Sequence, residues 1–137
     1  GGCLLTDKIY GRKVRELLQH KPNADMADLR LLKYGRHFRL NDGSKIIVGR
    51  DEEENRKLED LGQEYVKLQV TDRLGPVTLA PRGISSETKR LAASITARYS
   101  KKRETPSVAI RCWTNGEEEL LEVLPMDDQS LSLWRIG

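Results

Sequence analysis

Apolar residues recur along the chain at two spacings, one typical of helices and the other of strands. In the stretch 6–20 they follow the helical period, with Thr6 as a suitable N-cap and Pro22 ending the helix. Apolar residues and capping signals together predict helices over four stretches: 6–20, a short one between Asn23 or Asp25 and Gly35, 51–61, and one from Ser85 or Ser86 to Tyr99.

Alternating apolar residues predict the strands. They flank a turn at Asn41-Asp42-Gly43 and recur over 65–70, 77–79, 108–110 and 122–124. Residues 130–136 also alternate, and either a strand or a helix from Asp128 fits them. Because helices and strands are interspersed in a chain of 137 residues, we predict a single α+β domain with a mixed or antiparallel sheet, a β-hairpin and about three to four helices.

The turn at Asn41-Asp42-Gly43 sets the faces of the predicted hairpin. A three-residue loop, with glycine in the left-handed conformation, divides the flanking side chains into an apolar and a polar face; a two-residue Asp42-Gly43 turn would mix them. We therefore expect four side chains to point into the core: Phe38, Leu40, Ile46 and Val48. The outward face is expected to carry His37, Arg39, Lys45 and Ile47.

Charge is segregated along the chain, although the net charge is only +3. Lys and Arg outnumber Asp and Glu by 11 to 5 in residues 1–50 and by 8 to 2 in residues 81–111. The balance reverses to 2 against 6 in residues 51–62 and to 1 against 6 in residues 112–137. Two interpretations remain open: the basic blocks bind a polyanion, or they pair with the acidic blocks in the fold.

Several classes of protein find no support in the sequence. Motifs for ATP, dinucleotide, zinc-protease and serine-hydrolase chemistry are missing, and neither His20 nor His37 has a partner at metal-ligand spacing. The run Glu52-Glu53-Glu54 is better explained as a helix start than as a metal site. No apolar run approaches the ~20 residues of a membrane span, and the start lacks a secretory signal. We predict a cytoplasmic protein with no metal and no membrane partner.

The first residues, Gly-Gly-Cys-Leu-Leu-Thr-Asp, precede a predicted helix with a basic ridge. They resemble the segment that closes the catalytic part of PP-loop tRNA thiouridylases. The resemblance implies that Cys3 handles sulfur in the full-length protein, as a thiolate whose pKa the site must lower. It also implies that ATP binds only to an upstream domain, so that no cofactor is expected in this chain and residues 1–22 are the tail of that upstream region.

A second resemblance lies between Gly35 and Asn55. Gly-Arg-His-Phe-Arg-Leu, then Asp-Gly, then Ile-Val-Gly-Arg-Asp-x-x-x-Asn resembles the NFACT-R RNA-binding domain. It implies that residues 23–137 bind tRNA or another structured RNA beside a catalytic domain of the same polypeptide. Phosphate contacts are then expected from Arg36, Arg39, Lys45 and Arg50, with His37 adding a stacking or hydrogen-bond contact. Further contacts are expected from Lys8, Arg12, Arg15, Arg98, Lys101, Lys102 and Arg103.

Three functional hypotheses follow. The first is an RNA-binding C-terminal domain of a tRNA-thiolating enzyme, without catalysis of its own; whether the chain is itself an enzyme is left open. The second is a protein-interaction module whose charged blocks dock onto a catalytic partner. The third makes the chain part of the sulfur-transfer site through Cys3. Because aromatic residues make up only 5% of the chain, recognition of folded RNA by its backbone is favoured over stacking of single strands.

Overall fold

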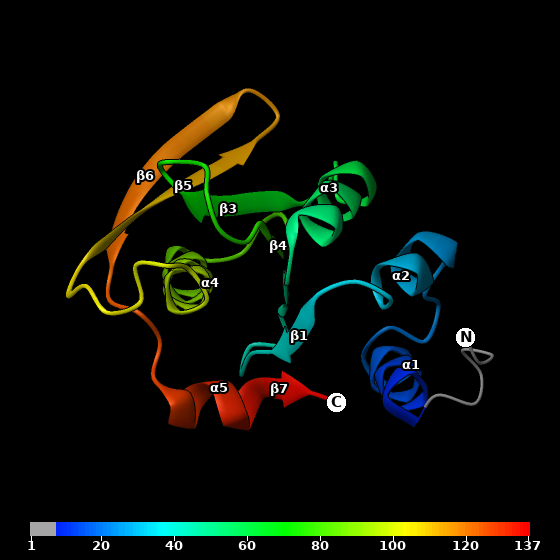
Figure 1. Ribbon diagram of the computed structural model, residues 1–137. Coiled ribbons are helices and arrows are strands. Elements are labelled where there is room, and N and C mark those ends of the chain that lie inside the picture. The colour runs from blue at the N-terminus through cyan, green and yellow to red at the C-terminus, as the bar shows by residue number, and fades with distance from the viewer. Residues whose placement is uncertain (1–7) are drawn as a thin grey trace.

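An antiparallel sheet occupies the centre of the computed structural model, which describes residues 8–137 (Figure 1). The described helices are α1 (Lys8–His20), α2 (Met26–Leu31), α3 (Glu52–Leu61), α4 (Ser86–Arg98) and α5 (Asp128–Trp134). The strands are β1 (Arg36–Arg39), β2 (Lys45–Val48), β3 (Val66–Val70), β4 (Thr78–Ala80), β5 (Val108–Thr114), β6 (Glu117–Val123) and β7 (Arg135–Ile136). They are ordered β6-β5-β3-β4-β2-β1-β7, and the predicted α+β class is confirmed.

The hairpin β1–β2 has the predicted three-residue loop. Arg39 and Lys45 form the last strand pair, and the Leu40 amide donates to the Ser44 carbonyl at 2.9 Å, which leaves Asn41-Asp42-Gly43 as the loop. Gly43 has φ +88°, the left-handed conformation that favours glycine. The register therefore puts Phe38 and Ile46 on one face of the hairpin, and His37 and Ile47 on the other.

The C-terminal stretch forms the helix α5, which begins at Asp128, followed by the short strand β7. Of the two structures predicted for residues 130–136, the helix is therefore the correct one up to Trp134. The Asp127 side chain accepts a hydrogen bond from the Ser130 amide and caps α5. Alternation is misleading here because Leu131 is buried whereas Leu133 is 75% exposed. After α5, β7 pairs antiparallel with β1, with Phe38 opposite Arg135.

Helices cover both faces of the β1–β2–β4 part of the sheet (Figure 1). On one face, Phe38, Ile46 and Val48 join the main core with the inward side chains of α4 and with Leu131 of α5. On the other face, a second cluster combines Leu31 of α2 and Leu58 of α3 with Ile47 and Leu79.

The hairpin therefore has no solvent-facing side, and the expectation that His37 points outward is wrong. Its side chain is 0% exposed. Its Nε2 lies 2.8 Å from the Tyr34 carbonyl oxygen, and burial lowers the pKa of His37 well below its ordinary value, so the ring is neutral. A neutral, fully buried imidazole does not contact a phosphate. Within residues 8–137, no helix has the length and apolar character needed to cross a bilayer.

Candidate nucleic-acid interface

The segment Val48-Gly49-Arg50-Asp51, with Asn55, joins β2 to α3. The Gly49 amide donates to the Val77 carbonyl at 2.9 Å. Asn55 completes the connection to the segment before β4, because its Oδ1 accepts from the Val77 amide at 3.0 Å and its Nδ2 donates to the Gly75 carbonyl at 3.2 Å. A Cβ atom on Gly49 would lie 2.1 Å from Asn55 Oδ1. The spacing of this motif thus has a structural cause: it locks β2, α3 and β4 together.

Arg50 is held by the first turn of α3. Its Nε and Nη2 donate to the two carboxylate oxygens of Glu54 at 2.9 and 2.8 Å, and its amide donates to the same carboxylate at 3.0 Å. The Arg50 side chain is 48% exposed and that of Glu54 12%. Asp51 caps the helix by accepting from the Glu54 amide, which confirms the predicted helix start. Arg50, which the sequence predicts as a phosphate contact, is thus held in an ion pair with Glu54.

Acid should remove the contribution of this ion pair. The hydrogen bond from Arg50 lowers the pKa of Glu54 from 4.5 to about 2. The stabilisation of the fold by the Arg50–Glu54 ion pair is therefore fully present above pH 4.5 and is lost as the pH falls through about 2. We expect Glu54→Gln to lower the free energy of unfolding at pH 7 and to approach the wild type near pH 2, measured by urea denaturation across that range. Glu53→Gln, in the same helical turn, is the control; equal effects of both variants at pH 7 would contradict the assignment.

Arg36 lies at the same end of the hairpin, on the face of α4. Its guanidinium carbon is 4.5 Å from the ring centroid of Tyr99, which follows α4. The Tyr99 ring lies 6.0 Å from that of Phe38, and the guanidinium carbon of Arg135 is 5.5 Å from the Phe38 centroid. Burial, and then the like charges of Arg135 and Arg50, lower the pKa of Arg36. Arg36 of β1, Arg135 of β7 and Arg50, which lies between β2 and α3, thus converge beside the end of α4.

We call this surface the cationic end. It comprises Arg36, Arg50 and Arg135 with the cations around the C-terminus of α4, namely Arg98, Lys101, Lys102 and Arg103. The structure therefore brings the predicted contacts of the hairpin, Arg36 and Arg50, together with those of the 98–103 segment, about 60 positions after Arg36 in sequence. Arg135 was missed because it is the only cation in an acidic segment, and its pairing with β1 is not visible in the sequence.

Apart from Glu54, which binds Arg50 and is largely buried, the counter-ions within the cationic end are distant or exposed. Arg98 Nη2 lies 2.6 Å from Asp128 Oδ1, and Lys102 Nζ lies 3.5 Å from Asp72 Oδ2. Arg103 is 3.8 Å from a carboxylate oxygen of its neighbour in sequence, and Lys101 forms no ion pair with the residues that the structure describes. Exposed pairs of this kind contribute roughly 0–1 kcal/mol, so a phosphate group can replace the carboxylate.

The other predicted contacts are elsewhere. Arg39 lies on the opposite face of β1 from Arg36 and forms a two-pronged ion pair with Glu16 of α1 at 2.7 and 2.6 Å; its side chain is 16% exposed. The α1 residues Lys8, Arg12 and Arg15 are exposed and form a separate basic ridge. Cys3 lies outside the described residues.

Lys45 is half-buried beside Arg39. Burial, and then the charge of Arg39, lower the pKa of Lys45 from 10.5 to about 8. Within residues 8–137 its ammonium group forms no hydrogen bond or ion pair with a protein side chain. At neutral pH Lys45 is therefore a charged lysine that forms no ion pair with the described residues, although the charges of Glu16 and Asp28 partly offset the lowering of its pKa.

Removing this charge should stabilise the protein. Because the folded-state pKa of Lys45 is lowered, the cost of burying its ammonium group is fully present below pH 8 and disappears as the pH rises through 10.5. We expect Lys45→Met to raise the free energy of unfolding at pH 7 by on the order of 1–3 kcal/mol, with a smaller gain at pH 10.5. Urea denaturation at both pH values measures this; a destabilised variant at pH 7 would show that the ammonium group is satisfied in the fold.

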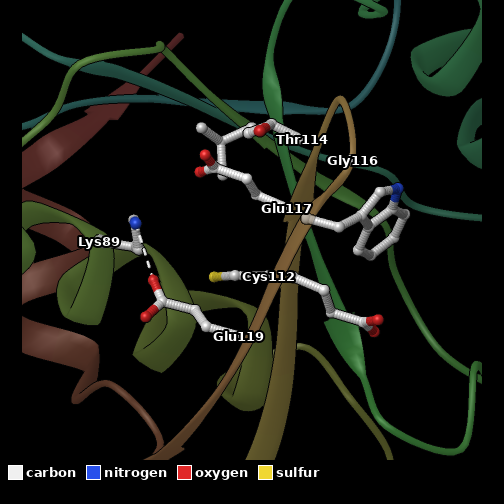
Figure 2. A pocket seen from close by; sticks show the side chains of 9 residues that line it. Lys89, Cys112, Thr114, Gly116, Glu117 and Glu119 are labelled. Carbon is white, nitrogen blue, oxygen red and sulfur yellow. Dashed lines mark hydrogen bonds and ion pairs between the residues drawn. The ribbon is translucent and has the colours of Figure 1, made fainter.

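A hollow of about 500 Å³ lies at the end of the β5–β6 hairpin, where Cys112 and Glu119 point to the same side as Lys89 (Figure 2). Lys89 Nζ is 2.7 Å from Glu119 Oε1. Three consecutive glutamates, Glu117 to Glu119, line the hollow and disfavour a phosphate backbone there. Burial raises the pKa of the Cys112 thiol to about 12, so this cysteine is not a nucleophile. In the described part of the chain, no group of three or more His, Cys, Asp or Glu side chains is placed to hold a metal.

Comparison with known proteins supports a nucleic-acid interface. The chain is similar in fold to the C-terminal part of the fibronectin/fibrinogen-binding protein from Streptococcus suis, with a TM-score of 0.67 and 16% sequence identity over 93% of this chain and 67% of that one. No curated protein matches the chain. Residues 35–135 match the family described as the NFACT protein RNA binding domain. This match spans the hairpin, the Gly49–Asn55 junction and the cationic end up to Arg135, and the chain belongs to the NFACT RNA-binding domain family.

Proposed function

We propose that the chain binds structured RNA, tRNA in particular, through phosphate contacts made by the cationic end. The observation that carries this proposal is the convergence of Arg36, Arg50 and Arg135 beside the 98–103 segment. Arginines fixed by aromatic rings and by ion pairs lose little conformational freedom when they bind a phosphate oxygen. The exposed cations of α1, namely Lys8, Arg12 and Arg15, form a secondary contact surface.

Shape and backbone recognition suits this surface better than base stacking. Tyr99 and Phe38 are already in contact with arginine side chains or packed in the core, so neither ring is free to stack on a base. A surface that has cations but no free aromatic ring is suited to contact the sugar–phosphate backbone. Proteins recognise folded RNA mostly through such backbone contacts and through its shape.

The salt dependence of RNA binding tests this proposal. The chain is titrated with a folded tRNA and with a single-stranded RNA of equal length, by fluorescence anisotropy between 50 and 300 mM KCl. We expect tighter binding of tRNA and an affinity that falls steeply with salt, since each phosphate contact releases counter-ions. If tRNA does not associate with the chain at 50 mM KCl, the RNA-binding proposal is wrong, and a docking module for a protein partner becomes the better explanation.

We further propose that the parent protein thiolates tRNA in the cytoplasm, with ATP bound by an upstream domain. The support is the stretch Gly1–Asp7, in which Cys3 occupies the position of the sulfur-handling cysteine of PP-loop thiouridylases. The test is Cys3→Ser in the full-length protein, with thiolated tRNA measured by mass spectrometry. Loss of thiolation together with normal tRNA binding is expected, and full thiolation would exclude a role for Cys3.

A further inference from the structure

A second cavity, of about 500 Å³, lies on the face of the sheet opposite to the cationic end. It is partly open to solvent and is lined by residues of α1, α2, β1 and β2 and of the segments that precede β3 and follow β4. Apolar walls come from Leu17, Ile47 and Pro81, together with the half-buried ring of Tyr65. Cavities that bind small organic ligands have volumes of about 300–1,000 Å³ and mostly apolar walls with a few polar groups.

All but one of the cationic side chains that line this cavity form ion pairs with carboxylates. Lys21 Nζ is 2.8 Å from Asp28 Oδ2, Arg39 is bound to Glu16 at 2.6 Å, and Arg82 Nη1 is 3.4 Å from Glu64 Oε2. His20 shares Glu16 at 3.4 Å. Lys45 is left as the one lining cation that has no ion pair or hydrogen bond with the described residues.

This arrangement has a chemical consequence. A half-buried ammonium group beside an apolar cavity is costly unless an anion neutralises it. Tyr65 also lines the cavity, and its hydroxyl makes no hydrogen bond to another described residue, so that it is available as a second polar contact. Inorganic phosphate would satisfy the lysine but would leave most of the apolar wall uncovered.

We infer that the cavity binds one nucleotide unit, with its phosphate at Lys45 and its base against the ring of Tyr65. Stacking of a base on an aromatic ring contributes about 1–3 kcal/mol and tolerates any base, and the ammonium group accounts for the single negative charge of a phosphodiester. The choice of a nucleotide over another anion with an apolar body rests on the RNA-binding function proposed above. The nucleotide is either a free nucleoside monophosphate or one residue of an RNA chain.

The experiment titrates the chain with the four nucleoside 5′-monophosphates and with inorganic phosphate, followed by NMR chemical shifts. We expect nucleotides to bind and to shift resonances of residues around the cavity, with inorganic phosphate binding at least about tenfold more weakly. Lys45→Met and Tyr65→Leu should each weaken nucleotide binding by about tenfold or more. Lys57→Met, which removes an exposed lysine of α3, is the matched control and should bind as the wild type does.

Two results would overturn the inference. The first is equal binding of inorganic phosphate and nucleotides, which would indicate a simple anion site. The second is that nucleotides do not bind and that Lys45→Met has no effect on the affinity for RNA. Loss of RNA affinity in Lys45→Met without binding of free nucleotides would instead identify the occupant as a residue of an RNA chain. Thermal unfolding of each variant confirms that the fold is retained.

The two proposals can fail separately. Neutralising Lys101, Lys102 and Arg103 affects only the cationic end, and should leave the binding of nucleoside monophosphates unchanged. If the chain binds nucleotides in the cavity but no RNA at low salt, the nucleotide site is supported and the RNA-binding proposal is wrong. If RNA binds with the expected salt dependence but the cavity variants bind nucleotides and RNA as the wild type does, RNA binding is supported and the nucleotide site is wrong.

Discussion

Gly49→Ala is expected to lower the free energy of unfolding by about 3 kcal/mol, at the upper end of overpacking effects. The added methyl group would lie 2.1 Å from Asn55 Oδ1 and 3.3 Å from Leu58 Cδ1, so the Asn55 side chain must move. Moving it breaks its hydrogen bonds to the Val77 amide and the Gly75 carbonyl. An unsatisfied buried backbone group costs about 1–3 kcal/mol, which adds to the steric term.

Urea denaturation of the variant at pH 7 measures this loss. Gly11→Ala is the control, because Gly11 lies within α1 and an added Cβ would meet only the end of the Arg15 side chain, at 3.6 Å. Alanine is favoured over glycine in a helix interior by about 1 kcal/mol, so this control should be neutral or stabilising. If Gly49→Ala unfolds at the same urea concentration as the wild type, the junction between β2, α3 and β4 is not rigid.

The motif around Gly49 shows how far a sequence can be interpreted. Its order of residues was enough to indicate the family, and the helix start after Asp51 followed from capping and charge alone. The reason for the glycine was not visible, because the obstructing atom belongs to a side chain six positions later and is held by a third segment. Capping and charge rules predict where a helix begins, whereas the close contact between Gly49 and Asn55 exists only in the packed fold.

The candidate site was less predictable than the fold for a related reason. The loop and alternation gave the correct two faces of the hairpin, but they gave no information about what covers each face. His37 is buried and Arg39 is paired because α1 to α3 pack on that side, a tertiary contact between segments that both precede and follow the hairpin. Similarly, Arg36 and the 98–103 segment meet only because α4 ends at Tyr99, beside β1.

Neutralising the exposed part of the cationic end should separate RNA binding from stability. We expect Lys101→Gln, Lys102→Gln and Arg103→Gln together to weaken tRNA binding by about 10- to 100-fold at 100 mM KCl. All three side chains are exposed in the turn after α4, and the ion pairs of Lys102 and Arg103, at 3.5 and 3.8 Å, are too weak to support the fold. The free energy of unfolding should therefore stay within about 0.5 kcal/mol of the wild type.

The slope of affinity against salt decides whether these cations contact phosphates. Each lost phosphate contact lowers the slope of log affinity against log salt by about one, so the triple variant should lose up to about three. Arg56→Gln with Lys57→Gln removes two exposed cations from α3 and changes the net charge without touching the cationic end. A control that weakens binding as much as the triple variant would mean that net charge alone attracts the RNA. A parallel shift in affinity with an unchanged slope would mean that the 101–103 segment acts without contacting phosphates. Only a smaller slope, confined to the triple variant, is consistent with direct phosphate contacts at the end of α4.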